Sequence, residues 1–286
     1  MKGTEGFDRA ALLLPGALRA EALFQPEERR RQAEEIRLRK GLGAWLCLPG
    51  TNVHLKSPVG SAEIEETLER ATKCSLYAAE ESMREGYFTA EGGFRLGFGG
   101  SLILRGGRPA GYRSISSLNI RIPHAVACIS DELFSILSGK SVIVYSPPGG
   151  GKTTFLRDLV RRVSDGGTRV SLVDERGELA ALSEGVPQFD VGCHTDVIEG
   201  CSKLQGVQML LRTMSPQVLA MDELTREELP VLTSGSAAGV RLIATAHAAD
   251  LEELMQRGIT GRMFDLAVGI EWKRGKRSYR VEELAC

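Results

Sequence analysis

The segment best suited to chemistry is a glycine-rich run that ends in lysine and two threonines. It reads Ser146, Pro147, Pro148, Gly149, Gly150, Gly151, Lys152, Thr153 and Thr154. Adjacent glycines let the backbone curl so that successive N–H groups point at phosphate oxygens. In such a loop the lysine reaches the β- and γ-phosphates of ATP, and the hydroxyl after it ligates Mg²⁺. The run therefore predicts a phosphate-binding loop, with Thr153 as a magnesium ligand.

The neighbouring sequence supports this interpretation. A continuous apolar run over 141–145 predicts a buried parallel strand directly before the loop. Apolar residues at helical spacing over 153–163 predict a helix directly after it. Strand, loop and helix in that order are the context that a phosphate-binding loop requires. One position departs from the usual pattern, because Ser146 stands where a glycine is expected, and we expect a shift in loop geometry without loss of binding.

Acidic residues follow another predicted strand. The apolar run 218–221 ends in Asp222 and Glu223. Side chains at the carboxyl ends of parallel strands face the crevice where ligands bind in open α/β sheets. We expect Asp222 to hold Mg²⁺ and Glu223 to position and deprotonate the attacking water. Glu175, which follows the predicted strand 169–173, is an alternative base. His247 follows the predicted strand 240–244 and is a candidate to sense the γ-phosphate.

Arginines complete the set of candidates. Arg212, Arg226 and Arg262 lie in the second half of the chain, and each is a candidate to approach the γ-phosphate bound by a neighbouring subunit. The sequence does not choose among them. A basic run over 273–280 is interpreted instead as a solvated hairpin turn.

Strands that alternate with helices dominate the second half, which predicts a parallel sheet covered on both faces. The first half differs, because short apolar runs separated by glycine pairs over 87–104 predict a meander of hairpins, preceded by a helix from residue 61. We expect an N-terminal lead over 1–26, a small α+β domain over 27–128 and a nucleotide-binding α/β domain over 129–286. The fold class is therefore α/β.

Composition narrows the class of protein. The 286 residues carry 36 Lys and Arg against 37 Asp and Glu, a net charge of −1, so no global basic excess favours nucleic acid. No apolar stretch approaches the roughly 20 residues of a membrane-spanning helix, and no secretory signal is recognised, so a cytoplasmic location is expected. The six cysteines form no CxxC pair and do not cluster with the four histidines, so no structural metal is expected.

The assembled motifs resemble those of the secretion-type ATPases of type II and type IV systems. Segments outside the nucleotide motifs resemble more closely the stage III sporulation protein AA family. They are Glu35 to Arg39, Ser75 to Ala78, Gly86 to Thr89, Gly92 to Gly97, Thr195 to Val197 and Arg212 to Pro216. The resemblance covers roughly 27–284. It departs at Ser146, where glycine is expected, and at Ser202, where proline is expected.

The resemblance to this family also implies a domain type, a cellular role and an assembly, which the residues alone do not indicate. It implies a RecA-like P-loop NTPase domain of the additional-strand, catalytic-glutamate (ASCE) division, related to AAA+ proteins. It also implies an ATPase that powers a channel between mother cell and forespore in an endospore-forming bacterium. The protein would work in the mother-cell cytoplasm as a homo-oligomer, expected to be a hexamer, docked to membrane proteins of that channel.

Two other functions remain open from the sequence. One is a nucleic-acid-stimulated ATPase, with Arg95, Arg105, Arg108, Arg113 and Arg121 as a patch on the small domain. The net charge and the 6% aromatic content argue against a large stacking surface for nucleic acid. The other is a nucleotide-gated assembly scaffold that binds ATP and barely hydrolyses it.

Overall fold

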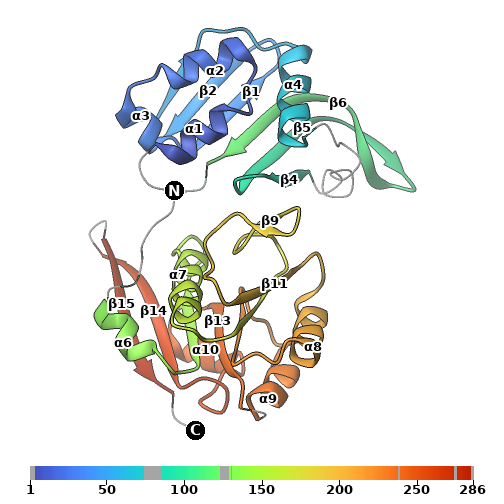
Figure 1. The fold of residues 1–286 in the computed structure, drawn as a ribbon. Coiled ribbons are helices and arrows are strands. Elements are labelled where there is room, and N and C mark those ends of the chain that lie inside the picture. The colour runs from blue at the N-terminus through green and yellow to red at the C-terminus, as the bar shows by residue number, and fades with distance from the viewer. Residues whose placement is uncertain are drawn as a thin grey trace. The chain divides into compact units, whose positions relative to one another are not determined.

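The computed structural model describes residues 4–73, 86–122, 129, 131–237, 239–273 and 276–284. The chain divides into two compact units, Met1–Ala125 and Val126–Cys286. Each unit has its own apolar core, and each is described by itself (Figure 1). Residues 74–78, part of the helix expected from residue 61 and one of the segments of family resemblance, lie outside the described residues.

The N-terminal unit is an antiparallel sheet covered by short helices. Its six strands lie in the order β3-β2-β1-β6-β5-β4. The strands are β1 (Glu35–Arg39), β2 (Gly43–Leu48), β3 (Thr51–Leu55), β4 (Tyr87–Ala90), β5 (Phe94–Arg105) and β6 (Arg108–Arg121). The helices are α1 (Glu5–Ala11), α2 (Gly16–Leu23), α3 (Glu27–Gln32) and α4 (Ser61–Ala71). The hairpins expected over 87–104 are therefore present, and β5 and β6 are longer than expected.

The segment expected to precede this unit lies inside it. Phe7, Leu14 and Leu18, all at most 1% exposed, pack in the same core as Ile36 and Leu96 of the sheet. The apolar residues of α1 recur at helical spacing, so the hydrophobic effect drives this helix onto the sheet. Residues 5–23 are thus part of the small domain, and the expected lead over 1–26 does not describe them.

The C-terminal unit is built on a mixed sheet of seven strands in the order β11-β8-β12-β13-β7-β14-β15. All neighbouring pairs are parallel except β14 and β15. The strands are β7 (Val142–Ser146), β8 (Val170–Asp174), β11 (Thr195–Glu199), β12 (Val218–Met221), β13 (Arg241–His247), β14 (Leu266–Lys273) and β15 (Lys276–Glu283). A separate ribbon pairs β9 (Leu182–Ser183) with β10 (Val186–Pro187).

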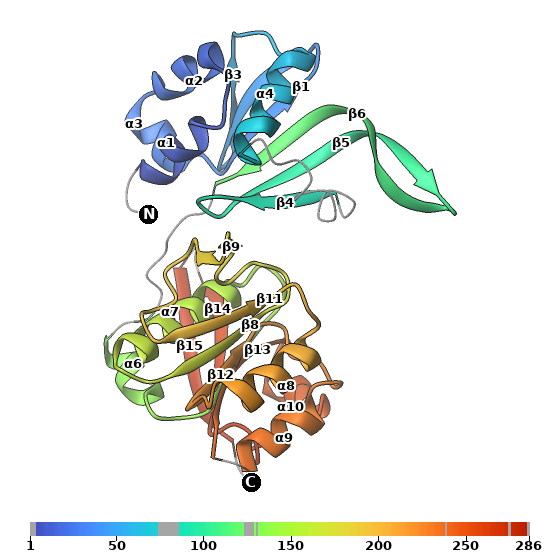
Figure 2. The same ribbon diagram turned by 45° about the vertical axis from the view of Figure 1, so that its right-hand side comes forward.

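Helices cover both faces of this sheet, as the sequence predicted (Figure 2). Strand β7 shows why: Val142 and Val144 pack with Phe155 of α7 on one face, and Ile143 and Tyr145 pack on the other. Alternation along a strand sends successive side chains to opposite faces, so a fully apolar strand needs cover on both. The helices are α6 (Asp131–Leu137), α7 (Lys152–Asp165), α8 (Lys203–Thr213), α9 (Leu229–Ala237) and α10 (Leu251–Gln256). The predicted α/β fold class is confirmed.

Candidate functional site

The glycine-rich loop joins β7 to α7. Gly149 and Gly151 have φ angles of +77° and +95°, which side chains rarely adopt, so glycine is required for this curl. Ser146 is buried, and its Oγ donates to the carbonyl oxygen of Pro147 at 2.9 Å. A Cβ added to Gly150 would lie 2.1 Å from Ser146 Oγ. The serine at the first position is thus accommodated because Gly150 leaves room for it.

Lys152 begins α7 and lies under this loop, 5% exposed. Its Nζ donates to the carbonyl oxygens of Ser146 and Pro147, at 3.1 and 3.3 Å. Burial lowers the pKa of Lys152, and the charges of Asp222 and Glu223 oppose that effect. A buried ammonium held by weak neutral acceptors is well placed to bind a phosphate, which is a stronger, charged acceptor.

His247 connects this lysine to Glu223. Lys152 Nζ lies 3.0 Å from His247 Nδ1, and His247 Nε2 lies 3.1 Å from Glu223 Oε1. An ammonium group only donates, so we assign Nδ1 as the acceptor and place the imidazole proton on Nε2, from which it donates to the carboxylate. The neutral imidazole therefore couples the position of the loop lysine to that of the acid.

Asp222 lies opposite the loop, at the end of β12. Thr153 Oγ1 donates to Asp222 Oδ2 at 2.6 Å, and Thr245 Oγ1 donates to Asp222 Oδ1. The two residues predicted to hold magnesium are therefore in contact. A hydroxyl and a carboxylate are oxygen ligands of the kind that Mg²⁺ prefers, usually together with waters and substrate phosphates. This donor set fits Mg²⁺ beside the phosphate loop.

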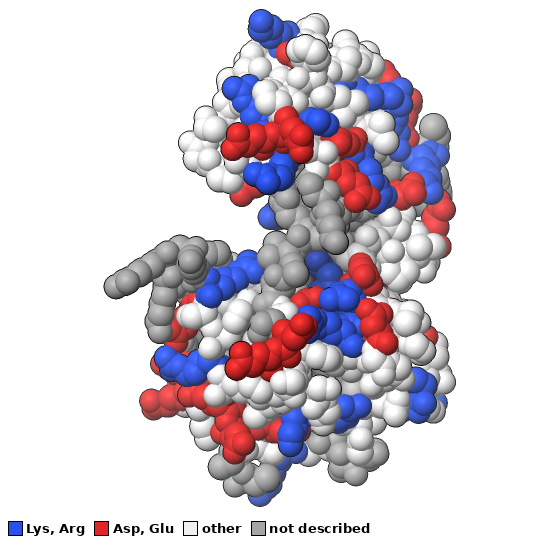
Figure 3. All heavy atoms as spheres, turned by 60° about the vertical axis from the view of Figure 1, so that its left-hand side comes forward, with Lys and Arg blue, Asp and Glu red and all other residues white. Residues whose placement is uncertain are grey.

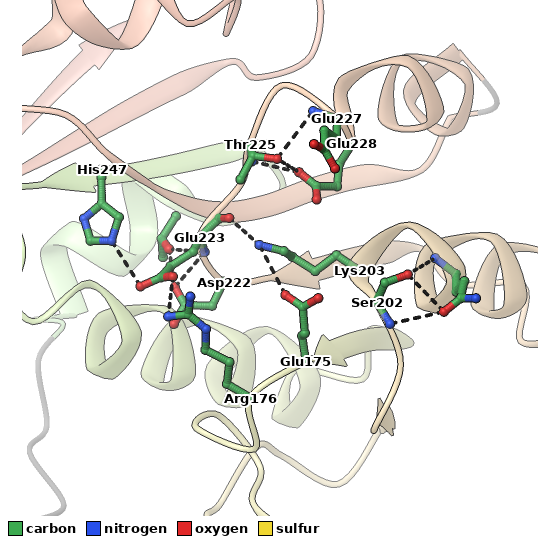
Figure 4. Close-up of polar contacts among 12 residues, drawn as sticks. Glu175, Arg176, Ser202, Lys203, Asp222, Glu223, Thr225, Glu227, Glu228 and His247 are labelled. Atoms are coloured by element: carbon green, nitrogen blue, oxygen red, sulfur yellow. Dashed lines mark hydrogen bonds and ion pairs between the residues drawn. The ribbon is translucent and has the colours of Figure 1, made fainter. Parts of the chain in front are cut away.

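Glu223 has an unusual backbone and two partners for its side chain. Its φ is +51°, in the left-handed region that non-glycine residues seldom occupy. Its N–H donates to Thr245 Oγ1 at 2.8 Å, which helps to hold that conformation. Arg176 Nη1 lies 2.6 Å from Glu223 Oε2, while His247 contacts the other oxygen (Figure 4). Strained backbone of this kind clusters at functional sites.

Glu175, the alternative base, is placed differently. Its carboxylate lies 3.6 Å from Lys203 Nζ, and the same ammonium donates to the carbonyl oxygen of Glu223 at 2.5 Å (Figure 4). Lys203 is the first residue of α8, and Ser202, which stands where proline was expected, caps that helix by accepting from the N–H of Gln205. Glu175 is thus near the site, with an ammonium between it and Glu223.

Asp174 precedes Glu175 and has a structural role. Its carboxylate accepts from the backbone N–H groups of Glu178, Leu179, Ala180 and Ala181, at 2.7–3.2 Å. These bonds fix the turn after β8. This turn carries Glu175 and Arg176 at the site. Asp174 therefore contributes by holding these two residues in position.

The candidate arginines are dispersed. A cavity of about 270 Å³ beside Glu223 and His247 is also lined by Arg176, Arg226 and Arg257. Arg226 Nη2 donates to the carbonyl oxygen of Gln256 at 2.7 Å. Arg212 is exposed in the last turn of α8, and Arg262 is exposed in a turn. Neither lines this cavity, so the structure brings only Arg226 of the three candidates close to Glu223.

Two basic residues were missed as site residues. Lys203 belongs to no recognisable sequence motif. Its ammonium contacts Glu223 only because the fold brings these two distant residues together. Arg277 of β15 was assigned to a solvated run, but a Cβ added to Gly151 would lie 2.9 Å from its Cζ. Its guanidinium thus packs against the phosphate loop. No local pattern distinguishes Arg277 from the other basic residues around this turn, and only the β7–β14–β15 arrangement places it there.

Comparison with known proteins decides the family. The family described as Sporulation stage III, protein AA matches residues 11–275, which span both units. The chain belongs to this family. Stage III sporulation protein AA of Bacillus subtilis (strain 168) is 34% identical over 264 residues, with 89% of this chain and 86% of that protein covered. The stage III sporulation protein AA resemblance found in the short sequence segments is therefore confirmed.

Two solved structures share the fold of this family member. The X-ray structure of the Legionella pneumophila ATPase DotB has a TM-score of 0.60 at 13% identity, covering 94% of this chain and 80% of that one. The pilus retraction motor PilT with bound ADP has a TM-score of 0.61 at 16% identity, covering 89% and 80%. At these identities the likeness concerns the fold. In the described part of the chain, no helix combines the length and apolarity needed to span a membrane.

Proposed function

We propose that this member of the stage III sporulation protein AA family binds and hydrolyses ATP. The observation that carries the proposal is the meeting of three motifs at one edge of the sheet. Thr153 of the phosphate loop contacts Asp222, and Lys152 of the same loop is linked through His247 to Glu223. A triphosphate on the loop would have its terminal phosphate beside this acid. PilT, which shares the fold, was solved with bound ADP, which is consistent with nucleotide binding here.

Each residue has a defined task in the proposed reaction. The N–H groups of Gly149, Gly150 and Gly151 and the Lys152 ammonium would bind phosphate oxygens, with the Thr154 hydroxyl near the same helix end. Bound Mg²⁺ would neutralise charge between the β- and γ-phosphates, held by Thr153 and Asp222. Glu223 would orient a water molecule and accept its proton as the water attacks the γ-phosphorus, while the bond from that phosphorus to the bridging oxygen breaks and ADP leaves. His247 holds Glu223 in place through Nε2.

Glu223 is the better candidate for the base. It follows Asp222 directly, and its carboxylate oxygens contact His247 and Arg176 at the edge of the cavity. The Glu175 carboxylate is instead paired with Lys203. We therefore assign Glu175 to positioning Lys203, which in turn binds the Glu223 carbonyl oxygen.

The family membership supports a finer proposal about the role. We propose that the protein drives a channel between mother cell and forespore, from the mother-cell cytoplasm, as a homo-hexamer docked to membrane proteins. Among the candidate arginines, Arg226 is the one that lines the cavity beside Glu223, so it is placed to contribute to the site of its own subunit. The near-neutral net charge gives no support to a nucleic-acid substrate.

ATP turnover and particle size in the same samples test the proposal. We expect phosphate release that rises per subunit as oligomers form, and loss of ADP binding and turnover in Lys152→Ala. Lys140→Ala removes an exposed lysine two residues before β7, so it is a matched control that should behave like the parent. Turnover that stays near zero in fully formed oligomers would support the nucleotide-gated scaffold instead. Equal turnover in the parent and Lys152→Ala proteins would remove the assignment of the loop.

A further inference from the structure

The long hairpin of the N-terminal unit has an unusual charge. Residues 94–121 contain Arg95, Arg105, Arg108, Arg113 and Arg121 and no lysine or acidic residue, in a chain whose net charge is −1. This contrasts with the interspersed basic and acidic side chains on the face shown in Figure 3. Arg95 lies 3.8 Å from the ring centre of Tyr87, and Arg121 lies 3.9 Å from Glu35, so both have partners at the base of the hairpin.

The outer arginines have no such partners. Arg105, Arg108 and Arg113 are exposed, and they make no ion pair or side-chain hydrogen bond with any residue that the structure describes. Arg105 and Arg108 are directly opposite each other across the turn at Gly106 and Gly107. Like charges in such a pair destabilise a hairpin. No acidic residue of the hairpin offsets this cost, so the charge concentrated at the tip is suited to an anionic partner.

The same tip is apolar. Leu102, Ile103 and Leu104 precede Arg105, and their exposed fractions are 45%, 39% and 60%. Successive residues of a strand point to opposite faces, so aliphatic side chains stand on both faces of the ribbon. Figure 2 shows this end of β5 and β6 extending beyond the helices and the other strands of its unit. A flat protein surface would cover only one face of the ribbon.

We propose that the tip of the β5–β6 hairpin binds directly to anionic lipid bilayers. The three aliphatic side chains would enter the boundary between headgroups and acyl chains, which surrounds a narrow ribbon on both faces. Arg105, Arg108 and Arg113 would bind the phosphates of anionic headgroups around it. Nucleic acid fits less well, because single strands bind to exposed aromatic rings, and Tyr112, the aromatic residue of the outer ribbon, is half-buried against Phe98.

Charge and apolar insertion both contribute to the affinity, and the charge sets the preference for anionic lipid. Each arginine near an anionic leaflet contributes about fivefold in binding, so three contribute roughly 100-fold. One aliphatic side chain that enters the bilayer contributes about tenfold. Binding is therefore expected on anionic vesicles and at low salt, and it should weaken as salt screens the surface. In an oligomer several tips would act together, which increases the apparent affinity without any new contact.

Co-sedimentation of the full-length protein with vesicles tests this inference. We expect binding to mixed phosphatidylglycerol–phosphatidylcholine vesicles and roughly 100-fold weaker binding to pure phosphatidylcholine. Changing Arg105, Arg108 and Arg113 together to glutamine should lower binding roughly 100-fold. Leu104→Ser should lower it about tenfold. Leu42→Ser, at a 68% exposed leucine in the turn between β1 and β2, is the matched control and should leave binding unchanged. Circular dichroism establishes that each variant is folded.

A second measurement detects insertion itself. Leu104→Trp should show blue-shifted emission that is quenched by brominated lipids, against the background of Trp45 and Trp272 in the parent protein. Three results would overturn the proposal. They are equal binding of the parent and the arginine variant, equal loss in Leu42→Ser, or salt-sensitive binding of a single-stranded oligonucleotide through these arginines without binding to vesicles. These results are independent of ATP turnover, so they separate this inference from the proposed function.

Discussion

The guanidinium of Arg176 lies 2.6 Å from the carboxylate of Glu223, while His247 contacts the other oxygen of that carboxylate at 3.1 Å. The proposed base is therefore held from both sides. Arg176 comes from the turn after β8, which Asp174 fixes, and its side chain remains 57% exposed. An exposed ion pair of this kind is weak and exchanges its partners readily. A γ-phosphate arriving beside Glu223 would compete with the carboxylate for Arg176.

This arrangement predicts a role for Arg176 in turnover. In Arg176→Ala we expect kcat to fall at least about tenfold, because the arginine would bind the γ-phosphate as it leaves Glu223. ADP lacks that phosphate, so its affinity should change less than about twofold, and Arg176→Lys should recover part of kcat. The measurement is kcat and ADP affinity in the same preparations. Arg257→Ala is the control, because Arg257 lines the same cavity but pairs at 2.6 Å with Glu253 of α10, the helix that ends just before it. Equal losses in the two variants would contradict this role.

The two candidate bases can be separated by isosteric substitution. Glu223→Gln should lower kcat about 100-fold or more, because a general base contributes roughly 10²–10⁴ in rate. ATP affinity should remain, since the loop and Thr153 are unchanged. Glu175→Gln should lower kcat less than about tenfold, because Glu175 acts through Lys203. Steady-state turnover with equilibrium ATP binding measures both. The reverse order of the two effects would assign the base to Glu175.

The fit of Ser146 against Gly150 gives a prediction about the loop. A Cβ on Gly150 would lie 2.1 Å from Ser146 Oγ and 3.2 Å from the Pro147 carbonyl oxygen. We expect Gly150→Ala to weaken ADP binding at least about tenfold, since the loop must open to relieve the contact. Adding Ser146→Gly removes the closest atom, so the double variant should regain most, though not all, of the affinity. Titration with a fluorescent ADP analogue measures all three proteins. A double variant as weak as Gly150→Ala would show that this contact is not the cause.

Tyr145 makes stability depend on alkaline pH. Burial, and then the hydrogen bond of its hydroxyl to Glu282 at 2.8 Å, raise the pKa of Tyr145 from 10.0 to about 12. A raised pKa means that the folded state keeps the proton that the unfolded state loses. The contribution is therefore complete below pH 10 and is lost as the pH rises through about 12. Its full size is at most about 2–3 kcal/mol, because solvent near the partly buried hydroxyl screens the effect.

Urea unfolding at increasing alkaline pH tests this linkage. The parent protein should lose stability above about pH 10 faster than Tyr145→Phe, which lacks the titrating hydroxyl. Other ionisable groups are common to both proteins, so the difference between the two curves isolates Tyr145. Parallel curves would mean that the hydroxyl titrates alike in both states.

The site was predictable where one short segment carries the signal. Glycine spacing between a strand and a helix located the phosphate loop, and acids after an apolar strand located Asp222 and Glu223. Contacts among side chains from separate strands had no such signal. The bridge by His247, the pairing of Arg176 with Glu223 and the approach of Arg277 to Gly151 exist only because the strand order brings β13, β8 and β15 to their places.

The same distinction applies to the fold. The alternating strands and helices of the C-terminal unit were predictable, because buried parallel strands are continuous apolar runs. Strand β11 lies at the edge of its sheet and is only partly buried, so its sequence lacks such a run. In the N-terminal unit, helix α1 was missed although Phe7, Ala10, Ala11 and Leu14 recur at helical spacing. That pattern was available, but short helices are weak signals until a sheet exists to pack against.

The most direct test of the central claim is a crystal structure of the Glu223→Gln protein with ATP and Mg²⁺. The account predicts a triphosphate in the loop 146–154, with Lys152 Nζ within hydrogen-bonding distance of its terminal phosphates. Magnesium should be held by the side chains of Thr153 and Asp222. The substituted residue 223 should face the γ-phosphate. The account would be contradicted by a nucleotide bound elsewhere. It would also be contradicted if the side chains of Asp222 and residue 223 pointed away from the γ-phosphate.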